Sequence, residues 1–422
     1  MTVAGKKRGI WRISAVPQHY AWGRNAAESE VASLLDSSGE KIDESLPYAE
    51  LWMGTHPSGP SVILEDCLTG QCAGLPLKEA ISVEGEVMGD LSVDGIDQHC
   101  DLPFLFKVLS VKTALSIQSH PDKRLAEKLH KAQPDQYKDA NHKPEMAIAL
   151  SGFEALCGFC AEQEISETLG SVPEFAECCG EKLVGKYLHS NCEGKAVALK
   201  EIFTCLMTME NDQASTLVKK LILRLEKEME HRPLTKKELL ALRLDQQYPS
   251  DIGVLSSFLL NYICLENGQA IALGPNEPHA YLSGEIVECM ATSDNVIRAG
   301  LTPKYKDTNA LCSSLTYKQG KPAVISGECF QSGKAKLYRP DFDEFEVWRL
   351  HLKDDDELML PSAEGPIIAF CQMGDCLMKW DDQELVLSKG AIVFIPANTP
   401  ILLSTKNAVN IWAASVNKKG WW

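Results

Sequence analysis

Hydrophobic residues follow two different patterns along the chain. Residues 101–117 (DLPFLFKVLSVKTALSI) are rich in apolar and β-branched side chains and are followed by Pro121, which predicts strands that end before the proline. From about Ala161 to Tyr248, Leu and Ile recur every three or four residues among Lys and Glu, which predicts amphipathic helices. Strand-like sequence returns near Tyr262 and continues to the C-terminus. This order predicts a helical segment inserted into an otherwise all-β framework.

One helix boundary inside the helical block can be placed from local sequence. The stretch HRPLT, residues 231–235, interrupts the periodic pattern. Thr235 is a good N-cap, and Glu238 follows three residues later in capping-box register. We therefore predict that a helix begins directly after Thr235.

The β sequence contains two similar segments. Residues 268–279 align without gaps on residues 390–401, and each has a glycine, a short apolar run and an Asn-x-Pro turn. The alignment predicts two copies of one β module, although twelve positions are also compatible with chance similarity between two turns. His279 of the first copy aligns with Ile401 of the second, so only the first copy keeps a possible metal ligand at this position.

Composition excludes several classes of protein. The chain has 422 residues with 42 Lys and Arg against 58 Asp and Glu, a formal charge of −16. This balance argues against a nucleic-acid partner or an anionic-membrane partner, because both require positive surfaces. The first residues do not predict a signal peptide, and no run approaches the roughly 18 apolar residues that a membrane-spanning helix needs. The fifteen cysteines show no repeated spacing, so we expect reduced thiols and a cytoplasmic protein.

Four residues of metal-ligand type lie near predicted strand ends. Gln118 and His120 alternate with Ser119 and should share one strand face, Glu145 follows a proline, and His279 follows another. Taken singly, each has a simpler explanation as a polar strand edge, a solvated acid or a turn histidine. One amide oxygen, two imidazoles and one carboxylate together would suit a borderline divalent ion such as Zn²⁺.

The segment from His279 to Lys304 is dense in acids, bases and anion-binding side chains. An anionic substrate would require several cations to converge locally, because the whole protein is acidic. A pocket of low dielectric constant can focus such a local field despite the opposite net charge. The cations available for this are Lys107, Lys143, Arg298, Lys304 and Lys306.

Two long motifs resemble a known family. The stretches YKDANHKPE (137–145) and HAYLSGEIVECMATSDNVIRAGLTPK (279–304) are similar to the signature motifs of type I mannose-6-phosphate isomerases, also called phosphomannose isomerases. The resemblance covers essentially the whole chain, more loosely in the last hundred residues. Supporting matches are QHYAWG (18–23), PYAELWMGTHPSG (47–59), LPFLFKVLSV (102–111), SIQSHPDK (116–123) and MAIALSGFEALCGF (146–159).

The resemblance implies a mainly β fold with a helical insert, built from two cupin-type jelly rolls. The expected catalytic jelly roll comprises residues 1–155 and 260–325. The expected helical insert comprises residues 156–259, and the expected non-catalytic jelly roll comprises residues 326–422.

The resemblance also implies the activity and the site. The expected reaction is the metal-dependent interconversion of mannose 6-phosphate and fructose 6-phosphate, which supplies mannose 6-phosphate for GDP-mannose synthesis and protein glycosylation. The expected partner is thus a phosphorylated hexose, and the expected assembly is a monomer. The implied zinc ligands are Gln118, His120, Glu145 and His279. Arg298 matches the catalytic arginine of the family, and the residues that match other positions lining its pocket are Lys107, Ser116, Lys143, Tyr281, Glu288, Asp294 and Lys304.

Such an isomerisation moves a proton between C2 and C1 through a cis-enediol, so it needs a base and a phosphate anchor. Arg298 would add fixed positive charge, since a guanidinium stays protonated. Glu288 could be the base if burial raises its pKa, and Lys143 or Lys304 could be the base if burial and nearby cations lower theirs; we favour Lys143 or Glu288. We expect Lys304, together with Lys107 and Ser116, on the phosphate side.

Two other functions could use part of this residue set. Two histidines and a glutamate on a cupin could form the facial triad of a non-haem iron dioxygenase. Gln118 and the cluster of cations argue against that chemistry. A non-catalytic sugar-binding cupin would explain the β modules, but it gives no role to Glu288, Arg298 and Lys304. Oxygen uptake would favour the first alternative, and metal binding without turnover would favour the second.

Overall fold

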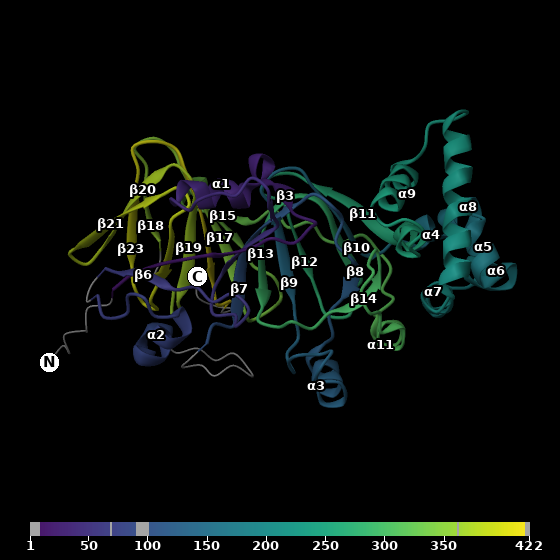
Figure 1. Ribbon diagram of the computed structural model, residues 1–422, viewed down its shortest axis with the longest axis horizontal. Coiled ribbons are helices and arrows are strands. Elements are labelled where there is room, and N and C mark those ends of the chain that lie inside the picture. The colour runs from purple at the N-terminus through teal and green to yellow at the C-terminus, as the bar shows by residue number, and fades with distance from the viewer. Residues whose placement is uncertain (1–8, 68–69, 90–100, 361–362, 418–422) are drawn as a thin grey trace.

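The protein has two β regions side by side and a helical region at one end (Figure 1). The structure is a computed structural model that describes residues 9–67, 70–89, 101–360 and 363–417. The sheets and the helical insertion confirm the predicted mainly β fold with an α insert.

The ten-stranded sheet forms the first β region and is organised around its longest strand, β13 (His279–Ala291). β13 pairs antiparallel with β7, β8, β9 and β10, so segments far apart in sequence meet along it. The other strands of this sheet are β2 (Val16–Gln18), β5 (Glu50–Met53), β7 (Phe104–Val111), β8 (Ile117–Ser119), β9 (Glu145–Ala149), β10 (Phe153–Phe159), β11 (Leu260–Leu265), β12 (Ala270–Leu273) and β14 (Ile297–Gly300).

β7 and β13 are buried on both faces, which explains why their sequences are apolar almost throughout. Leu109 and Ile286 contribute to one core cluster inside this region. Val108 and Val287 point to the opposite face and pack in a second cluster shared with the C-terminal region. A strand with a core on both faces needs apolar side chains at successive positions. The polar residues of these two strands are therefore exceptional positions.

The second β region consists of an eight-stranded and a four-stranded sheet around a separate apolar core. Two strands from the N-terminal part, β1 (Trp11–Ile13) and β6 (Ile63–Asp66), extend the larger sheet, so residues 1–155 contribute strands to both β regions. The remaining strands of the larger sheet are β15 (Glu328–Phe330), β16 (Ala335–Tyr338), β17 (Glu346–Leu352), β19 (Ile367–Met373), β22 (Ile392–Ile395) and β24 (Val409–Ser415). The smaller sheet contains β18 (Glu357–Leu360), β20 (Asp375–Trp380), β21 (Gln383–Ser388) and β23 (Ile401–Ser404), and β3 (Arg24–Asn25) pairs separately with β4 (Pro47–Tyr48).

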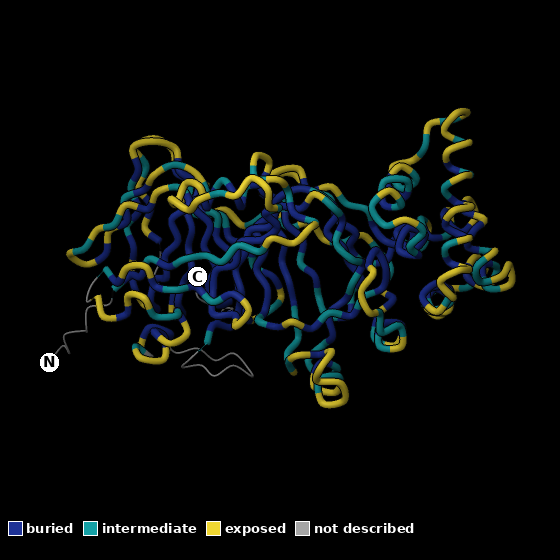
Figure 2. Tube along the Cα trace, viewed as in Figure 1, coloured by how far each residue is buried: buried dark blue, intermediate teal, exposed yellow. Residues whose placement is uncertain are grey.

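The helical insert confirms the predicted helical block. Its helices are buried toward their common core and exposed on their outer sides (Figure 2). The capping box at Thr235 and Glu238 is formed, and the helix after it begins at Lys236 as predicted. The helices of the insert are α4 (Glu162–Ser171), α5 (Glu174–Cys179), α6 (Glu181–His189), α7 (Cys192–Met207), α8 (Asn211–Met229) and α9 (Lys236–Gln247).

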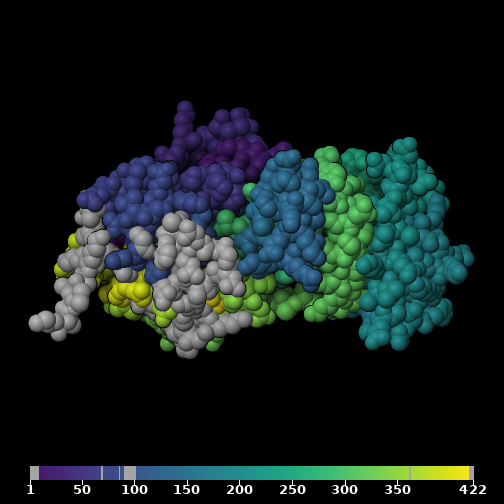
Figure 3. All heavy atoms as spheres, turned by 90° about the horizontal axis from the view of Figure 1, so that it is seen from below, coloured from purple at the N-terminus to yellow at the C-terminus, as the bar shows by residue number. Residues whose placement is uncertain are grey.

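Shorter helices lie around the β regions, and we did not predict them. Seen from below, α3 (blue) and the segment around α11 (green) lie side by side, next to the helical insert (teal; Figure 3). These helices are α1 (Glu30–Ser37), α2 (Leu77–Val83), α3 (Lys123–Ala132), α10 (Gly253–Ser256) and α11 (Thr308–Ser314), with 3₁₀ turns at Ala26–Glu28, Gly85–Met88, Ser257–Leu259 and Gln331–Gly333.

The two aligned segments have the same backbone geometry. Gly268 and Gly390 have φ angles of 80° and 82°, and Asn276 and Asn398 have φ angles of 61° and 57°. These left-handed conformations are rare for residues other than glycine and asparagine. Each glycine donates its N–H to the strand paired with the apolar run, Gly268 to the Ala149 carbonyl at 2.8 Å and Gly390 to the Cys371 carbonyl at 2.9 Å. The sequence similarity therefore reflects a shared local structure.

Candidate functional site

Strand pairing brings three of the predicted metal ligands together. Glu145 begins β9 and lies opposite Leu273 of β12 and Met290 of β13. His279 begins β13, and His120 directly follows β8, whose Gln118 lies opposite His279. Residues that precede and follow the whole helical insert in sequence thus meet at one site.

The two imidazoles face the two oxygens of one carboxylate. His120 Nε2 lies 3.2 Å from Glu145 Oε1, and His279 Nε2 lies 3.5 Å from Glu145 Oε2. Each residue offers one ligand atom, and these three atoms lie within 4.8 Å of one another. None of the three residues is more than 2% exposed. This spacing allows one metal ion to contact all three side chains.

The hydrogen bonds of the two histidines fix which nitrogen is free. Nδ1 of His120 lies 2.7 Å from the Asn295 carbonyl, and Nδ1 of His279 lies 3.0 Å from the Glu277 carbonyl. A carbonyl can only accept, so each Nδ1 must carry the proton and donate it. Each Nε2 then has a lone pair, is buried, and has no hydrogen-bond partner among the described residues. Buried polar atoms rarely lack partners, so the site fits a metal ion.

Gln118 lies in a row with two other predicted site residues. It is opposite His279 on one side and opposite Arg298 of β14 on the other. Directly opposed residues of antiparallel strands place their side chains on the same face. The Gln118 Oε1 atom also accepts from Ser116 Oγ at 3.3 Å. Its role as a fourth ligand remains a prediction.

Lys143 and Tyr281 both contact the Glu145 carboxylate. Lys143 Nζ is 3.2 Å from Oε1, and the Tyr281 hydroxyl donates to Oε2 at 3.5 Å. Burial alone would raise the pKa of Glu145, but neighbouring groups, among them Lys143, bring it well below its usual value. Burial also raises the pKa of Tyr281 well above its usual value. The carboxylate is therefore ionised, and the phenol stays a donor.

Lys107 is held between two carboxylates. Its Nζ atom lies 3.1 Å from Glu288 Oε2 and 3.3 Å from Glu50 Oε2, and it lies over the Trp52 ring at 4.9 Å from the centroid. Burial raises the pKa of Glu288, and Lys107 opposes that shift only in part. Sequence reasoning missed Glu50 and Trp52, although both lie in the quoted stretch PYAELWMGTHPSG. The available signal was that Glu50 and Trp52 alternate with Leu51 and so share one face of β5, on which Trp52 lies opposite Lys107.

The other predicted residues are more accessible. The Asp294 side chain is 45% exposed, and its Oδ1 atom lies 3.3 Å from His56 Nε2. The bond from His56 lowers the pKa of Asp294. Arg298 is partly buried, and Lys304 lies on the exposed loop after β14. The structure thus divides the predicted residues into a buried group around Glu145, a buried group around Lys107 and this more accessible set.

A hydrogen-bond network that we did not predict holds the partner of His120 in place. Asp139 Oδ1 accepts from Ser293 Oγ at 2.8 Å, and Asp139 Oδ2 accepts from the Asp294 amide at 2.8 Å. Asn295 Nδ2 donates to the Asp139 carbonyl at 2.8 Å. The two signature motifs are thereby bonded to each other. This network fixes the Asn295 carbonyl, and through it the orientation of the His120 ring.

The second copy of the β module has apolar residues at the equivalent positions. Asn276 donates its N–H to the His120 carbonyl, and Asn398 donates to the Ala363 carbonyl, both at 2.7 Å. Glu145 lies opposite Leu273, and Ile367 lies opposite the equivalent Ile395. The counterparts of His120, Glu145 and His279 are therefore Ala363, Ile367 and Ile401, which all belong to the C-terminal core.

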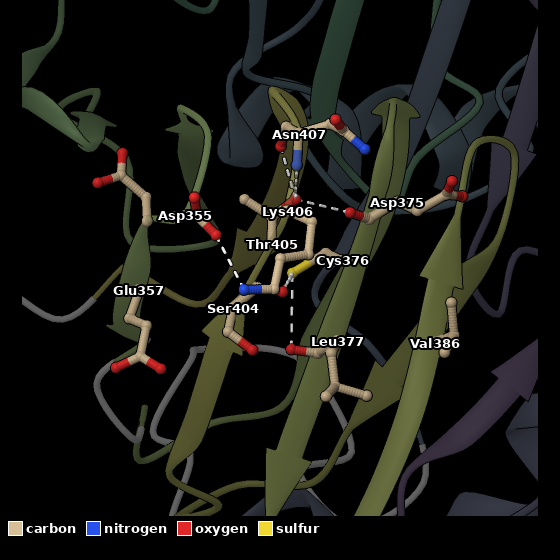
Figure 4. A pocket seen from close by; sticks show the side chains of 11 residues that line it. Asp355, Glu357, Asp375, Cys376, Leu377, Val386, Ser404, Thr405, Lys406 and Asn407 are labelled. Carbon is tan, nitrogen blue, oxygen red and sulfur yellow. Dashed lines mark hydrogen bonds and ion pairs between the residues drawn. The ribbon is translucent and has the colours of Figure 1, made fainter.

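A cavity of about 320 Å³ in the C-terminal region is not an alternative metal site (Figure 4). Its acidic lining has cationic partners, with Lys406 Nζ 2.9 Å from Asp355 Oδ1 and Lys334 Nζ 2.7 Å from Asp356 Oδ1. It contains none of the predicted site residues. Within the described residues, the grouping of His, Cys, Asp and Glu that could hold a metal is His120, Glu145 and His279.

Two further expectations concern location. No helix in the described ranges is both long and apolar enough to cross a membrane. The cysteines of the described residues are free.

Comparisons with known proteins give a consistent result. The family described as phosphomannose isomerase type I, catalytic domain, matches residues 10–161, and its helical insertion domain matches residues 181–260. Mannose-6-phosphate isomerase 1 of Arabidopsis thaliana is 42% identical over 418 residues, which cover 98% of this chain and 95% of that protein. Mannose-6-phosphate isomerase of Rattus norvegicus is 41% identical over 409 residues, which cover 93% and 95% respectively.

Solved structures agree in fold. A crystal structure of mannose 6-phosphate isomerase bound with zinc and yttrium superposes with a TM-score of 0.80 at 30% identity, covering 97% of this chain and all of that one (100%). The apo form from Salmonella typhimurium gives a TM-score of 0.79 at 30% identity, covering 97% of this chain and 99% of that one. With these matches over nearly its whole length, the chain belongs to the type I phosphomannose isomerase family.

Proposed function

We propose that this chain is a zinc-dependent isomerase that interconverts mannose 6-phosphate and fructose 6-phosphate. The observation that carries the proposal is the pair of buried, unbonded Nε2 atoms of His120 and His279 on either side of Glu145. Family membership supplies the reaction. Relatives with the name mannose-6-phosphate isomerase cover this chain almost completely.

We assign the zinc site to His120, Glu145, His279 and Gln118. When bound, Zn²⁺ would supply positive charge that polarises a substrate oxygen. The three buried residues provide two neutral nitrogens and one anionic oxygen. Burial lowers the pKa of His120 to about 4, so this ring remains neutral near pH 7. Gln118 adds a neutral oxygen from the adjacent strand.

Glu288 is our choice for the base that moves the proton. Its burial raises its pKa, and a carboxylate of raised pKa accepts a proton more readily than an ordinary glutamate. Glu288 would remove the C2 proton of mannose 6-phosphate while Lys143 protonates the C1 oxygen, which gives the cis-enediol. Glu288 would then return the proton to C1 while Lys143 takes back a proton from the C2 hydroxyl, which gives fructose 6-phosphate. Lys143, whose Nζ atom lies 3.2 Å from Glu145 Oε1, is placed to donate to a substrate oxygen.

The remaining residues suit substrate binding. Arg298 shares the face of Gln118 and His279, where fixed positive charge would stabilise the oxyanion of the enediol. Lys304 and Ser116 are proposed to contact the phosphate. Lys107 was expected there too, but its contacts with Glu50 and Glu288 favour a different use, which is to stabilise the charge on Glu288. Tyr281 orients Glu145, and Asp294 would contact sugar hydroxyls.

The domain division, assembly and location also remain proposals. We propose a catalytic jelly roll (1–155 and 260–325), a helical insert (156–259) and a non-catalytic jelly roll (326–422), with β1 and β6 extending the last of these. We further propose that the enzyme acts as a cytoplasmic monomer and supplies GDP-mannose synthesis. Light scattering during size-exclusion chromatography would test the assembly.

The activity is tested with the zinc-loaded full chain. We expect fructose 6-phosphate to form from mannose 6-phosphate, activity to disappear on chelation, and activity to return with added Zn²⁺. His279→Ala should fail to recover with Zn²⁺. Zinc-loaded protein without turnover would contradict the proposal and favour a binding protein, and oxygen consumption with an iron-loaded form would favour a dioxygenase.

A further inference from the structure

The C-terminal jelly roll contacts the loop that carries Lys143. Glu344 lies in the connection between β16 and β17, and its Oε1 atom accepts a hydrogen bond from His142 Nε2. Glu344 is only 7% exposed. His142 directly precedes Lys143 in the chain. We propose that Glu344 is a positioning residue, through which the non-catalytic jelly roll holds Lys143 in place by way of His142.

The opposite side of this loop is fixed within the catalytic region. Asn141 Nδ2 donates to the Thr292 carbonyl at 3.1 Å, and Asn295 Nδ2 donates to the Asn141 carbonyl at 2.9 Å. The Ala291 amide donates to the Pro144 carbonyl at 3.0 Å. Residues 141 and 144 are thus held by β13 and the segment after it. His142, between them, is held from the other side by Glu344.

The connection that carries Glu344 is itself anchored. Asn417 Nδ2 donates to the Pro340 carbonyl at 3.0 Å, and Phe345 is fully buried in the core shared with β7 and β13. Burial alone would raise the pKa of Glu344, but the bond from His142 brings the pKa below its usual value. An ionised carboxylate on an anchored connection is a fixed point against which a flexible loop can be held.

The metal ligands do not depend on this contact. Glu145 is held by strand pairing on both sides, opposite Leu273 and Met290. Loss of Glu344 should therefore leave zinc binding intact and displace Lys143. The inference rests on the proposed function, in which Lys143 donates to a substrate oxygen. A misplacement of about 1 Å in such a group can lower the rate by as much as about 100-fold.

The test compares Glu344→Gln, Glu344→Asp, His142→Gln and the double variant in the zinc-loaded full chain. Glu346→Gln is the matched control, because Glu346 lies two residues away and is also buried, but it pairs with Arg339 at 3.0 Å inside the C-terminal jelly roll. We expect Glu344→Gln to lower kcat about 10- to 100-fold with KM changed less than about twofold. Glu344→Asp should restore part of kcat, and the double variant should be no slower than the worse single variant.

A second measurement is independent of activity. Amide hydrogen exchange of residues 139–145 should become faster in Glu344→Gln and stay unchanged in Glu346→Gln. The positioning role is wrong if kcat and exchange of Glu344→Gln match the wild type, if Glu346→Gln lowers kcat equally, or if the two single effects add. An inactive zinc-loaded wild type would contradict the proposed function instead, and the exchange experiment would still decide whether Glu344 holds the loop.

Discussion

Glu288 and Lys107 face each other across β13 and β7, with Oε2 and Nζ 3.1 Å apart. Glu50 approaches the same ammonium from β5 at 3.3 Å. Two buried carboxylates therefore share one cation. Burial, together with this imbalance, gives Glu288 a raised pKa while keeping it hydrogen-bonded, which is the property required of a base in a buried site.

Replacing the shared cation should destabilise the protein. Lys107→Met leaves Glu50 and Glu288 buried without a counter-charge, and we expect the free energy of unfolding to fall by about 3–5 kcal/mol. Urea denaturation measures the change. Lys112→Met, an exposed lysine just beyond the same strand, serves as control and should change little. Equal midpoints for Lys107→Met and the wild type would show that the ion-pair group is not stabilising.

The network around Asp139 should control zinc affinity. Asp139→Asn replaces one carboxylate oxygen by an amide NH₂ group. That group would face an N–H or O–H donor and could not accept its hydrogen bond, so the segment carrying the Asn295 carbonyl would lose a bond that holds it. We expect zinc to bind about 10- to 100-fold more weakly, as measured by competition with a chelator. Asp135→Asn, at an exposed position of the same segment, should bind zinc like the wild type. Unchanged affinity in Asp139→Asn would mean that His120 needs no support from this network.

Glu285 should make stability depend on pH. Burial raises its pKa from 4.5 to about 7, although the Glu30 amide and Arg24 partly oppose the shift. Between these values the folded state holds a proton that the unfolded state releases, so this group lowers stability as pH rises from about 4.5 to about 7. Glu285→Gln cannot ionise, so it removes this pH-dependent loss of stability. The variant should therefore gain roughly 1–3 kcal/mol relative to the wild type across this window.

The check is urea unfolding of both proteins at pH 5 and pH 8. The difference between Glu285→Gln and the wild type should be larger at pH 8. A difference that shrinks with pH would reverse the sign and show that the ionised carboxylate, bonded to the Glu30 amide at 3.1 Å, is the stabilising form.

Equivalent positions in the two modules should respond in opposite ways. Ile401→Ala removes a fully buried side chain from the C-terminal core, and we expect a loss of about 2–5 kcal/mol in stability with kcat nearly unchanged. His279→Ala should abolish zinc binding and turnover, with a smaller effect on the metal-free protein. Thermal unfolding of metal-free samples and a zinc titration separate the two effects. Loss of zinc binding in Ile401→Ala would contradict the division of roles.

Local patterns were sufficient for much of the fold. The three- and four-residue spacing of Leu and Ile identified the insert, and Thr235 with Glu238 identified a helix start, because both depend on contacts within a few residues. The Gly and Asn-x-Pro positions at 268–279 and 390–401 showed the repeated module, because left-handed backbone restricts residue choice locally. The short helices α1, α2 and α3 were not predicted.

The site shows where sequence alone stops. The types of residue in the two motifs indicated an amide, two imidazoles and a carboxylate, and family resemblance indicated the ligands. Neither revealed that Glu50 shares Lys107 with Glu288, or that Glu344 holds His142 from the other jelly roll. Their partners lie 57 and 202 residues away in the chain, and such pairs are created only by strand register and by packing of one module on another.

The sequence by itself thus determined the element types, the repeated module and the chemistry of the metal site, since these follow from periodicity, backbone preference and residue type. Tertiary structure alone decided which nitrogen of each histidine is free, which acids share a cation, and how the second module supports the first. Those properties depend on distances between distant segments, and burial converts such distances into pKa shifts and fixed orientations.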